Sequence, residues 1–157
     1  MYFYKRLYKS RILFPLGLML ITFNMIIGCG KSYTSSGSGN PSGSEVNYGG
    51  SFMPSDSLDS TSAYGSVTAT FNIVSHTLDY TITWHLLTTL PVGMHFHDAG
   101  PIIIKINNFP VSLDGTVSGT ANLSSKQADD LAAGSVYAMI HSQKFPNGEI
   151  MAYLSKQ

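Results

Sequence analysis

Residues 66–86 read SVTATFNIVSHTLDYTITWHL, and this stretch decides the fold class of the protein. Every second position in each half is apolar, which is typical of a β-strand with one buried and one exposed face. These positions are Val67, Ala69, Phe71, Ile73, Leu78, Tyr80, Ile82, Trp84 and Leu86. Residues 74–77, between the two halves, are suited to a tight hairpin. The stretch therefore predicts two antiparallel strands whose sheet faces water on one side.

More strand-like segments lie on both sides of this hairpin, and Pro, Gly, Asn and Asp separate most of them. They cover residues 47–54, 92–97, 102–109, 115–122, 136–141 and 149–154. One short helix is predicted over residues 126–133. Ser124 or Ser125 can cap its first turn, and Gly134 can end it in a left-handed conformation.

These elements together predict an all-β domain. About eight short strands and one helix within ~110 residues indicate an antiparallel β-sandwich or a small Greek-key barrel. The one short helix falls near the C-terminal third, and a domain of this size can build its own hydrophobic core. The residues expected in that core are Phe71, Trp84, Tyr137, Met139 and the Ile102–Ile106 run.

The first 28 residues have the pattern of a bacterial secretion signal. Four basic residues lie near the start, namely Lys5, Arg6, Lys9 and Arg11. Residues 12–27 then run without a charge, but they are fewer than the ~20 that a transmembrane helix needs. Pro15, Gly17 and Asn24 also interrupt them. The segment therefore fits the apolar region of a cleaved signal peptide better than a permanent membrane span.

Cys29, the single cysteine, ends this segment in the sequence Ile26-Ile27-Gly28-Cys29. The tetrapeptide resembles the bacterial lipobox, in which a cysteine after a small residue receives diacylglycerol before cleavage. Gly28 fits this pattern, whereas Ile27 departs from the small residue usual there. We therefore expect an exported, palmitate-bearing lipoprotein, anchored through Cys29 to the bacterial cell envelope, at the outer membrane in a Gram-negative organism. The alternative is an ordinary signal peptide whose cysteine carries no lipid.

This interpretation divides the chain into three segments. Residues 1–28 are the lipoprotein signal peptide, residues 29–45 are the lipidated cysteine with a flexible Ser/Gly-rich tether, and residues 46–157 form the β domain. The mature chain has five basic and nine acidic residues, a net charge of −4. Such a chain lacks the electrostatic footprint of a nucleic-acid-binding protein, and without a second cysteine it forms no internal disulfide. Its expected partners are the membrane, through the lipid anchor, and an unknown envelope or extracellular ligand.

Three stretches of the domain carry a family resemblance. The first is residues 65–86, and the second is residues 93–102, GMHFHDAGPI. The third comprises residues 131–137, 140–142 and 145–150, which read LAAGSVY, IHS and FPNGEI. In order and spacing, over about 105 residues, they resemble the CHRD (chordin-type) domain family.

The resemblance implies a β-sandwich-like domain that occurs in chordin and in many bacterial exported proteins, mostly without an assigned activity. Two positions depart from the family pattern. Met151 stands where the family usually has Arg, and Ala152 stands where it usually has Gly. Any role of that Arg is therefore absent here. The growth-factor partners that accompany chordin have no evident place in a bacterium.

His95 and His97 form the clearest candidate for a binding site. Residues two apart on a strand project from the same face, so the two imidazoles are predicted to be neighbours. Met94 and Phe96 then point the other way, into the core. Two histidines arranged in this way can both reach one metal ion.

His141 and Glu149 are predicted to join this pair. If residues 136–141 and 149–154 form a hairpin centred on Phe145, then His141 and Glu149 face each other across it. Folded next to His95 and His97, they supply three imidazoles and a carboxylate. That ligand set suits Zn(II) or Cu(II).

Other interpretations of these residues stay open. The three histidines and Glu149 can form a hydrogen-bonded polar network that holds loops together, with Glu149 orienting an imidazole. Glu149 can instead accept backbone amides at the Pro-Asn-Gly turn, and the histidines can be unrelated surface residues. His76, in a turn, and His85, on a polar strand face, are expected to be solvated. Asp98 is expected to be a turn residue rather than a partner of His97.

No catalytic residues are indicated by the sequence. It has no spare cysteine nucleophile, no GxSxG elbow, no Walker-type glycine loop and no close carboxylate pair. The favoured function is a cell-envelope lipoprotein with a CHRD-like binding or structural module and no evident catalysis. The alternative is an exported protein that binds Cu or Zn, redox-active in the copper case, through His95, His97, His141 and Glu149. An exported hydrolase ranks third, because it lacks a nucleophile.

Overall fold

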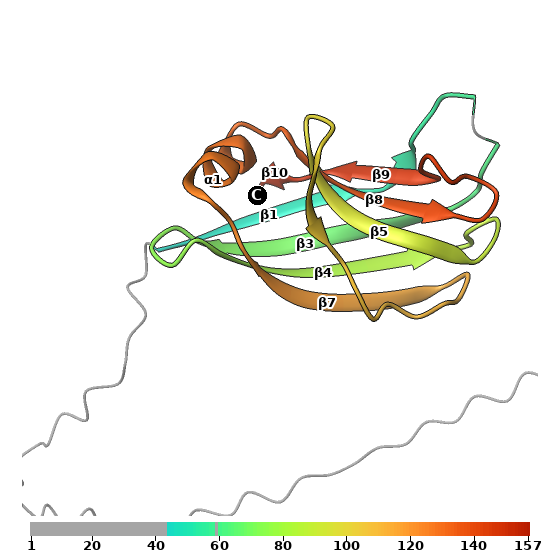
Figure 1. Ribbon diagram of the computed structural model, residues 1–157, viewed down its shortest axis with the longest axis horizontal. Coiled ribbons are helices and arrows are strands. Elements are labelled where there is room, and N and C mark those ends of the chain that lie inside the picture. Colours follow the sequence, from blue (N-terminus) through green and yellow to red (C-terminus); the bar gives the residue numbers. More distant parts are fainter. Residues whose placement is uncertain (1–43, 59) are drawn as a thin grey trace, which may run out of the picture. The chain divides into compact units, whose positions relative to one another are not determined.

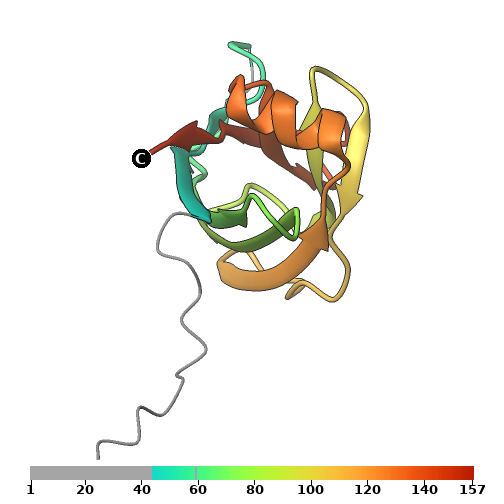
Figure 2. The same cartoon turned by 90° about the vertical axis from the view of Figure 1, so that its left-hand side faces the viewer.

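The computed structural model describes residues 44–58 and 60–157. The predicted signal peptide, Cys29 and nearly all of the predicted tether lie outside these residues. The described part forms two antiparallel five-stranded sheets with one short helix, which confirms the all-β sandwich (Figures 1 and 2). None of the described helices is long and apolar enough to cross a membrane.

Each sheet contains strands from distant parts of the sequence. The first sheet has the order β10-β1-β3-β4-β7. Its members are β1 (Glu45–Ser51), β3 (Tyr64–Asn72), β4 (Thr77–His85), β7 (Gly115–Asn122) and β10 (Ser155–Lys156). The second sheet has the order β2-β9-β8-β5-β6. Its members are β2 (Met53–Pro54), β5 (Pro91–Asp98), β6 (Ile102–Lys105), β8 (Val136–Ser142) and β9 (Ile150–Tyr153).

The predicted hairpin lies at the centre of the first sheet. β3 and β4 pair without interruption along the whole length of both strands. The inward residues of this hairpin are Val67, Ala69, Phe71, Leu78, Tyr80, Ile82 and Trp84. Ile73 and Leu86, predicted to share that face, are instead 47% and 55% exposed. Ile73 lies in the turn and Leu86 just beyond the end of β4, so neither follows the alternation of a strand.

The hydrophobic core lies between the two sheets, and two of the residues predicted for it lie elsewhere. Tyr137 and Met139 lie on the outer face of β8 and are partly exposed. The residues that alternate with them fill the core instead: Val136, Ala138 and Ile140. Of the Ile102–Ile106 run, only Ile106 is fully enclosed, because β6 is an edge strand. Phe71 and Trp84 are core residues as predicted.

The chain passes from one sheet to the other within one segment predicted as a single strand and directly after another. The segment 47–54 pairs with β3 up to Ser51, after which β2 pairs with β9 in the second sheet. The segment 149–154 likewise forms β9, and the chain then continues into β10, which pairs with β1. Phe52 and Leu154, at the two crossing points, are buried. The crossings join the sheets along one side of the sandwich.

The predicted helix is confirmed as α1 (Ser125–Ala132), at one end of the sandwich (Figure 2). Ser124 is its N-cap, and a capping box links Ser124 reciprocally with Gln127. Gly134 follows the helix with φ of 77°, the left-handed conformation that ends a helix. The fully buried side chain of Leu131 anchors the helix to the core.

Candidate functional site

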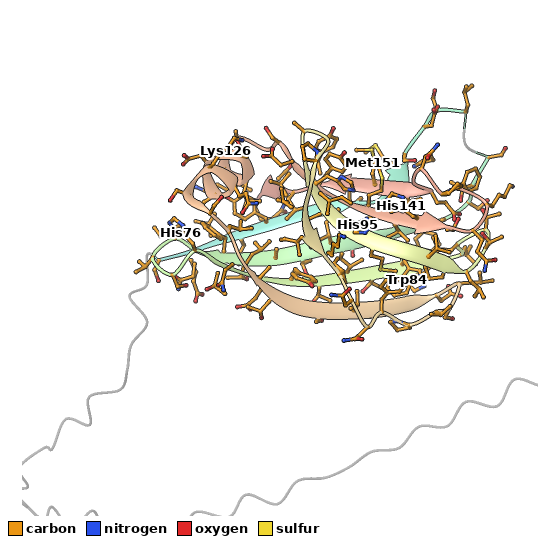
Figure 3. The ribbon with its side chains drawn as sticks, viewed as in Figure 1. His76, Trp84, His95, Lys126, His141 and Met151 are labelled. Atoms are coloured by element: carbon orange, nitrogen blue, oxygen red, sulfur yellow. The ribbon has the colours of Figure 1, made fainter. Side chains whose placement is uncertain are left out.

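The candidate site lies on the outer face of the second sheet, where β5 and β8 are neighbours. On β5, Met94 and Phe96 are fully buried, so His95 and His97 point outward, as the alternation predicts. On β8, His141 points outward in the same way. The pairing of the two strands places Met139 opposite His95, and His141 opposite Gly93. His141, far away in the sequence, is thereby brought beside His95 (Figure 3), and its ring centroid lies 6.2 Å from that of His97.

The three imidazoles form a compact group. One potential ligand nitrogen from each of His95, His97 and His141 lies within 4.8 Å of the other two. The ring centroids are 5.1 Å apart for His95 and His141, and 5.8 Å apart for His95 and His97. A tetrahedral metal ion bound at 2.0–2.1 Å needs its nitrogens about 3.3 Å apart. Small rotations of the side chains are therefore enough to close the group around one ion.

The hydrogen bonds of two rings select which nitrogen is free. His97 Nδ1 lies 2.7 Å from the carbonyl oxygen of Gly100, and His141 Nδ1 lies 3.0 Å from that of Pro146. A carbonyl only accepts, so Nδ1 carries the proton in both rings and donates it. Each Nε2 then keeps its lone pair for a ligand. Metal-binding histidines are commonly oriented by backbone carbonyls in this way.

One nitrogen of each ring lacks a hydrogen-bond partner among the described residues. His95 Nδ1, His97 Nε2 and His141 Nε2 are buried, and no hydrogen-bonding group among the described residues reaches them. Leaving a buried polar atom unpaired costs about 1–3 kcal/mol. Three such atoms, one from each ring of the same group, are available to a bound species, and Glu149 Oε2 is a fourth unpaired atom that lies outside the group.

Gly93 makes room for two of the rings. A Cβ at this position would lie 3.2 Å from His95 Cε1 and 3.8 Å from His141 Cδ2. Any larger side chain would displace at least one imidazole. Sequence reasoning missed this residue, although the alternation along β5 places Gly93 on the same face as His95 and His97.

The surroundings keep two of the imidazoles neutral. Burial lowers the pKa of His95, and the nearby His141, His97 and Lys105 lower it further. Burial also lowers the pKa of His141. The hydrogen bond to Pro146 raises this pKa and the nearby His97 lowers it, and the net shift is downward. A neutral imidazole is the form that binds metal. The lowered pKa values of His95 and His141 therefore favour the neutral form of both rings at neutral pH.

Aromatic rings line one side of the group. Tyr137 stacks on His97 with a centroid distance of 5.0 Å and an interplanar angle of 5°. Tyr153 lies 5.2 Å beyond Tyr137. His97 is thus held between a carbonyl partner and a flat ring, which fixes its orientation. The Asp98 carboxylate contacts Lys126 at 3.3 Å instead of an imidazole.

Glu149 lies outside this group, although its predicted position in the hairpin is correct. Tyr137–Tyr153 and Ile140–Ile150 pair in the register that centres on Phe145. Glu149, however, is fully buried, and its Oε1 accepts hydrogen bonds from Thr61 Oγ1 at 2.6 Å and from the Thr88 amide at 2.7 Å. The preceding Gly148 has φ of 126° and interrupts the alternation just before β9. The candidate ligands brought together are therefore three histidines without the carboxylate.

The two remaining histidines lie apart from the group. His85, at the end of β4 in the first sheet, contacts Asp114 at 3.3 Å. His76 lies in the turn between β3 and β4 with φ of 56°. Both side chains are partly exposed.

The comparison with protein families agrees with the resemblance seen in the sequence. Residues 49–154 match the family model of the CHRD domain. The matched range includes all three histidines of the group, together with Gly93 and Glu149. No match was found among curated proteins or among solved structures.

Proposed function

The chain belongs to the CHRD domain family, and we propose that it acts as a binding module of the cell envelope. In this proposal a lipid at Cys29 anchors the chain. His95, His97 and His141 form its metal centre. One observation carries the metal centre. Each of the three rings keeps a buried nitrogen that no described group satisfies. A single cation satisfies all three at once.

The hydrogen-bonded network is the weaker alternative. Such a network needs bonds between the histidines or between a histidine and Glu149. Within the described residues, the imidazoles hydrogen-bond only to the backbone carbonyls of Gly100 and Pro146. Glu149 hydrogen-bonds to Thr61 and Thr88 instead. The metal centre accounts for the same geometry and supplies a partner for each of the three buried nitrogens.

Three neutral nitrogen ligands with an open fourth position suit zinc or copper. With no carboxylate among the ligands, the bound cation keeps its full positive charge. The open position lets a small molecule or a partner's side chain complete the coordination. We therefore assign the site to binding and derive no catalytic step from it.

Metal content of the purified full-length chain tests the proposal. After dialysis against Zn(II), or separately against Cu(II), we expect a single ion per chain by elemental analysis and none above background in His97→Ala. His85→Ala is the matched control, because it removes a histidine from the other sheet and should retain the ion. Equal metal content in His97→Ala and the wild type would refute the centre.

The lipid anchor is tested separately, at Cys29. The basic start, the apolar run and the terminal cysteine support it. We expect Cys29→Ser to abolish incorporation of labelled palmitate in cells of the producing bacterium, whereas Ser35→Ala in the tether should incorporate it normally. Equal labelling of Cys29→Ser and the wild type would show that the cysteine carries no lipid.

A further inference from the structure

A row of three methionines leads across the second sheet to the histidine group. Met53 on β2 pairs with Met151 on β9, and Met151 pairs with Met139 on β8. Met139 in turn pairs with His95 on β5. Figure 3 labels Met151, His141 and His95 on these neighbouring strands. Directly paired residues share a face of the sheet, so the methionine row (Met53, Met151 and Met139) lies on the same outer face as the histidines.

We infer that this metal centre is a copper centre and that the methionine row carries copper(I) to it from the edge of the sheet. The inference rests on the proposed metal centre and adds the identity and the route of the ion. The transfer is an exchange of ligands in which copper stays in the +1 state. It therefore needs no electron donor or acceptor.

The chemistry of the row singles out copper(I). Thioethers are soft ligands that select Cu(I), whereas Zn(II) and Cu(II) are well served by imidazole alone. The outermost member, Met53, is 56% exposed at the sheet edge, and Met139 and Met151 are partly exposed. A copper(I) ion can therefore meet a sulfur ligand first at the surface and then at each neighbouring strand.

The spacing of the row suits a stepwise transfer. Directly opposed side chains on neighbouring strands have Cβ atoms about 4.5–5.5 Å apart. Methionine is unbranched and has three rotatable bonds, so neighbouring sulfurs can approach one ion together. Each step therefore exchanges one ligand before the previous one is lost.

The loop after β8 contacts both Met139 and His141, two residues that lie on the same face of β8. A Cβ at Gly148 would lie 2.6 Å from the Met139 sulfur, so the glycine leaves the sulfur its space. Pro146, in the same loop, accepts the hydrogen bond of His141. Met139 also lines a surface hollow of about 340 Å³, together with Phe145 and Asn147. Met139, next to the histidine group, therefore borders a hollow that an arriving ion can enter.

The outer face of the first sheet carries hydroxyl side chains where the second sheet carries the methionine row. At a corresponding place, the paired residues across β3, β4 and β7 are Thr68, Thr81 and Ser118. Hydroxyl side chains of this kind are the ordinary cover for a wet sheet face. Among the described residues, every methionine except the buried Met94 belongs to the row.

The test compares copper(I) and zinc uptake by the full-length chain under anaerobic conditions. Copper(I) is supplied from its coloured bicinchoninate complex, and its transfer is followed by loss of colour. The row variant, M53L/M139L/M151L, replaces each methionine by a residue of similar volume. We expect copper(I) transfer to slow about tenfold or more while zinc affinity stays within about twofold of the wild type. Met94→Leu, in the core beside His95, is the matched control and should transfer copper(I) normally.

The outcomes separate the row from the centre. If the row variant takes up copper(I) at the wild-type rate, the row has no role in delivery and this inference is wrong. If the wild type takes up neither copper(I) nor zinc, the proposed metal centre itself fails, and the inference fails with it. An unchanged circular dichroism spectrum and thermal midpoint of the row variant establish that a slower transfer is not caused by misfolding.

Discussion

Zinc at a hundredfold excess over its dissociation constant should raise the free energy of unfolding of this protein by about 2.7 kcal/mol. The ion binds only the folded chain, because the pairing of β5 with β8 is what brings His95 and His141 together. In a domain of this size, such a gain raises the thermal midpoint by roughly 10 °C. Thermal unfolding followed by circular dichroism measures the shift.

The chelator experiment with variants decides what causes the shift. A chelator should lower the midpoint of the zinc-loaded wild type and of His85→Ala to that of the metal-free protein. The same chelator should leave His95→Ala and His141→Ala unchanged, because neither retains the complete ligand set. Loss of stability on substitution alone does not distinguish a metal centre from a hydrogen-bonded network, since His141→Ala also loses the hydrogen bond to Pro146. A wild-type thermal midpoint that changes with neither zinc nor chelator would contradict the metal centre.

Replacing Glu149 by alanine should cost about 3 kcal/mol or more of unfolding free energy. The carboxylate is fully buried and joins two segments that are distant in sequence, through Thr61 and the Thr88 amide. Its removal leaves the Thr61 hydroxyl and the Thr88 amide without their acceptor and opens a cavity where the fully buried carboxylate lay. Denaturant unfolding measures the loss, and Asp129→Asn, an exposed carboxyl on α1, is the control with little expected effect.

The same residue should give the protein a characteristic acid sensitivity. Burial works to raise the pKa of Glu149, and hydrogen bonds from Ser142, Thr61 and Thr88 outweigh it, so the folded-state pKa is lowered from its ordinary value of 4.5. The stabilisation is therefore fully present above pH ~4.5 and is lost as the pH falls through the lower folded-state pKa. Glu149→Gln should unfold with a flatter dependence on pH below 4.5 than the wild type. If the free energy of unfolding of the two proteins depended on pH in the same way below pH 4.5, this account of Glu149 would be contradicted.

The central hairpin was predictable because its signal is local. From Ser66 to Asn72 in β3 and throughout β4 the apolar residues alternate with polar ones, so only one face can be buried. The ends of α1 were predictable for a similar reason, since Ser124 and Gly134 act within one turn of the helix. The crossings after Ser51 and after Tyr153 were not predictable. An extended segment has the same sequence pattern whether it stays in one sheet or passes to the other.

The strand β8 illustrates why the core residues could not all be predicted from the sequence. All five residues from Val136 to Ile140 are apolar or aromatic, so the alternation gives two acceptable orientations. Packing decides between them: Val136, Ala138 and Ile140 lie fully buried in the core between the sheets. Tyr137 and Met139 are consequently on the outer face. There they border the histidine group, which no local pattern indicates.

By itself, the sequence determined the CHRD family, from the order and spacing of its motifs, and the all-β fold and the common face of His95 and His97, from local alternation. The register of the β8–β9 hairpin was also within its reach. Only the tertiary structure decided that His141 joins the first two histidines, that Glu149 turns inward to Thr61 and Thr88, and that three methionines line up beside the group. These outcomes depend on the pairing of strands that are distant in sequence and on one glycine that breaks the alternation. Both are set by the packing of the whole sandwich.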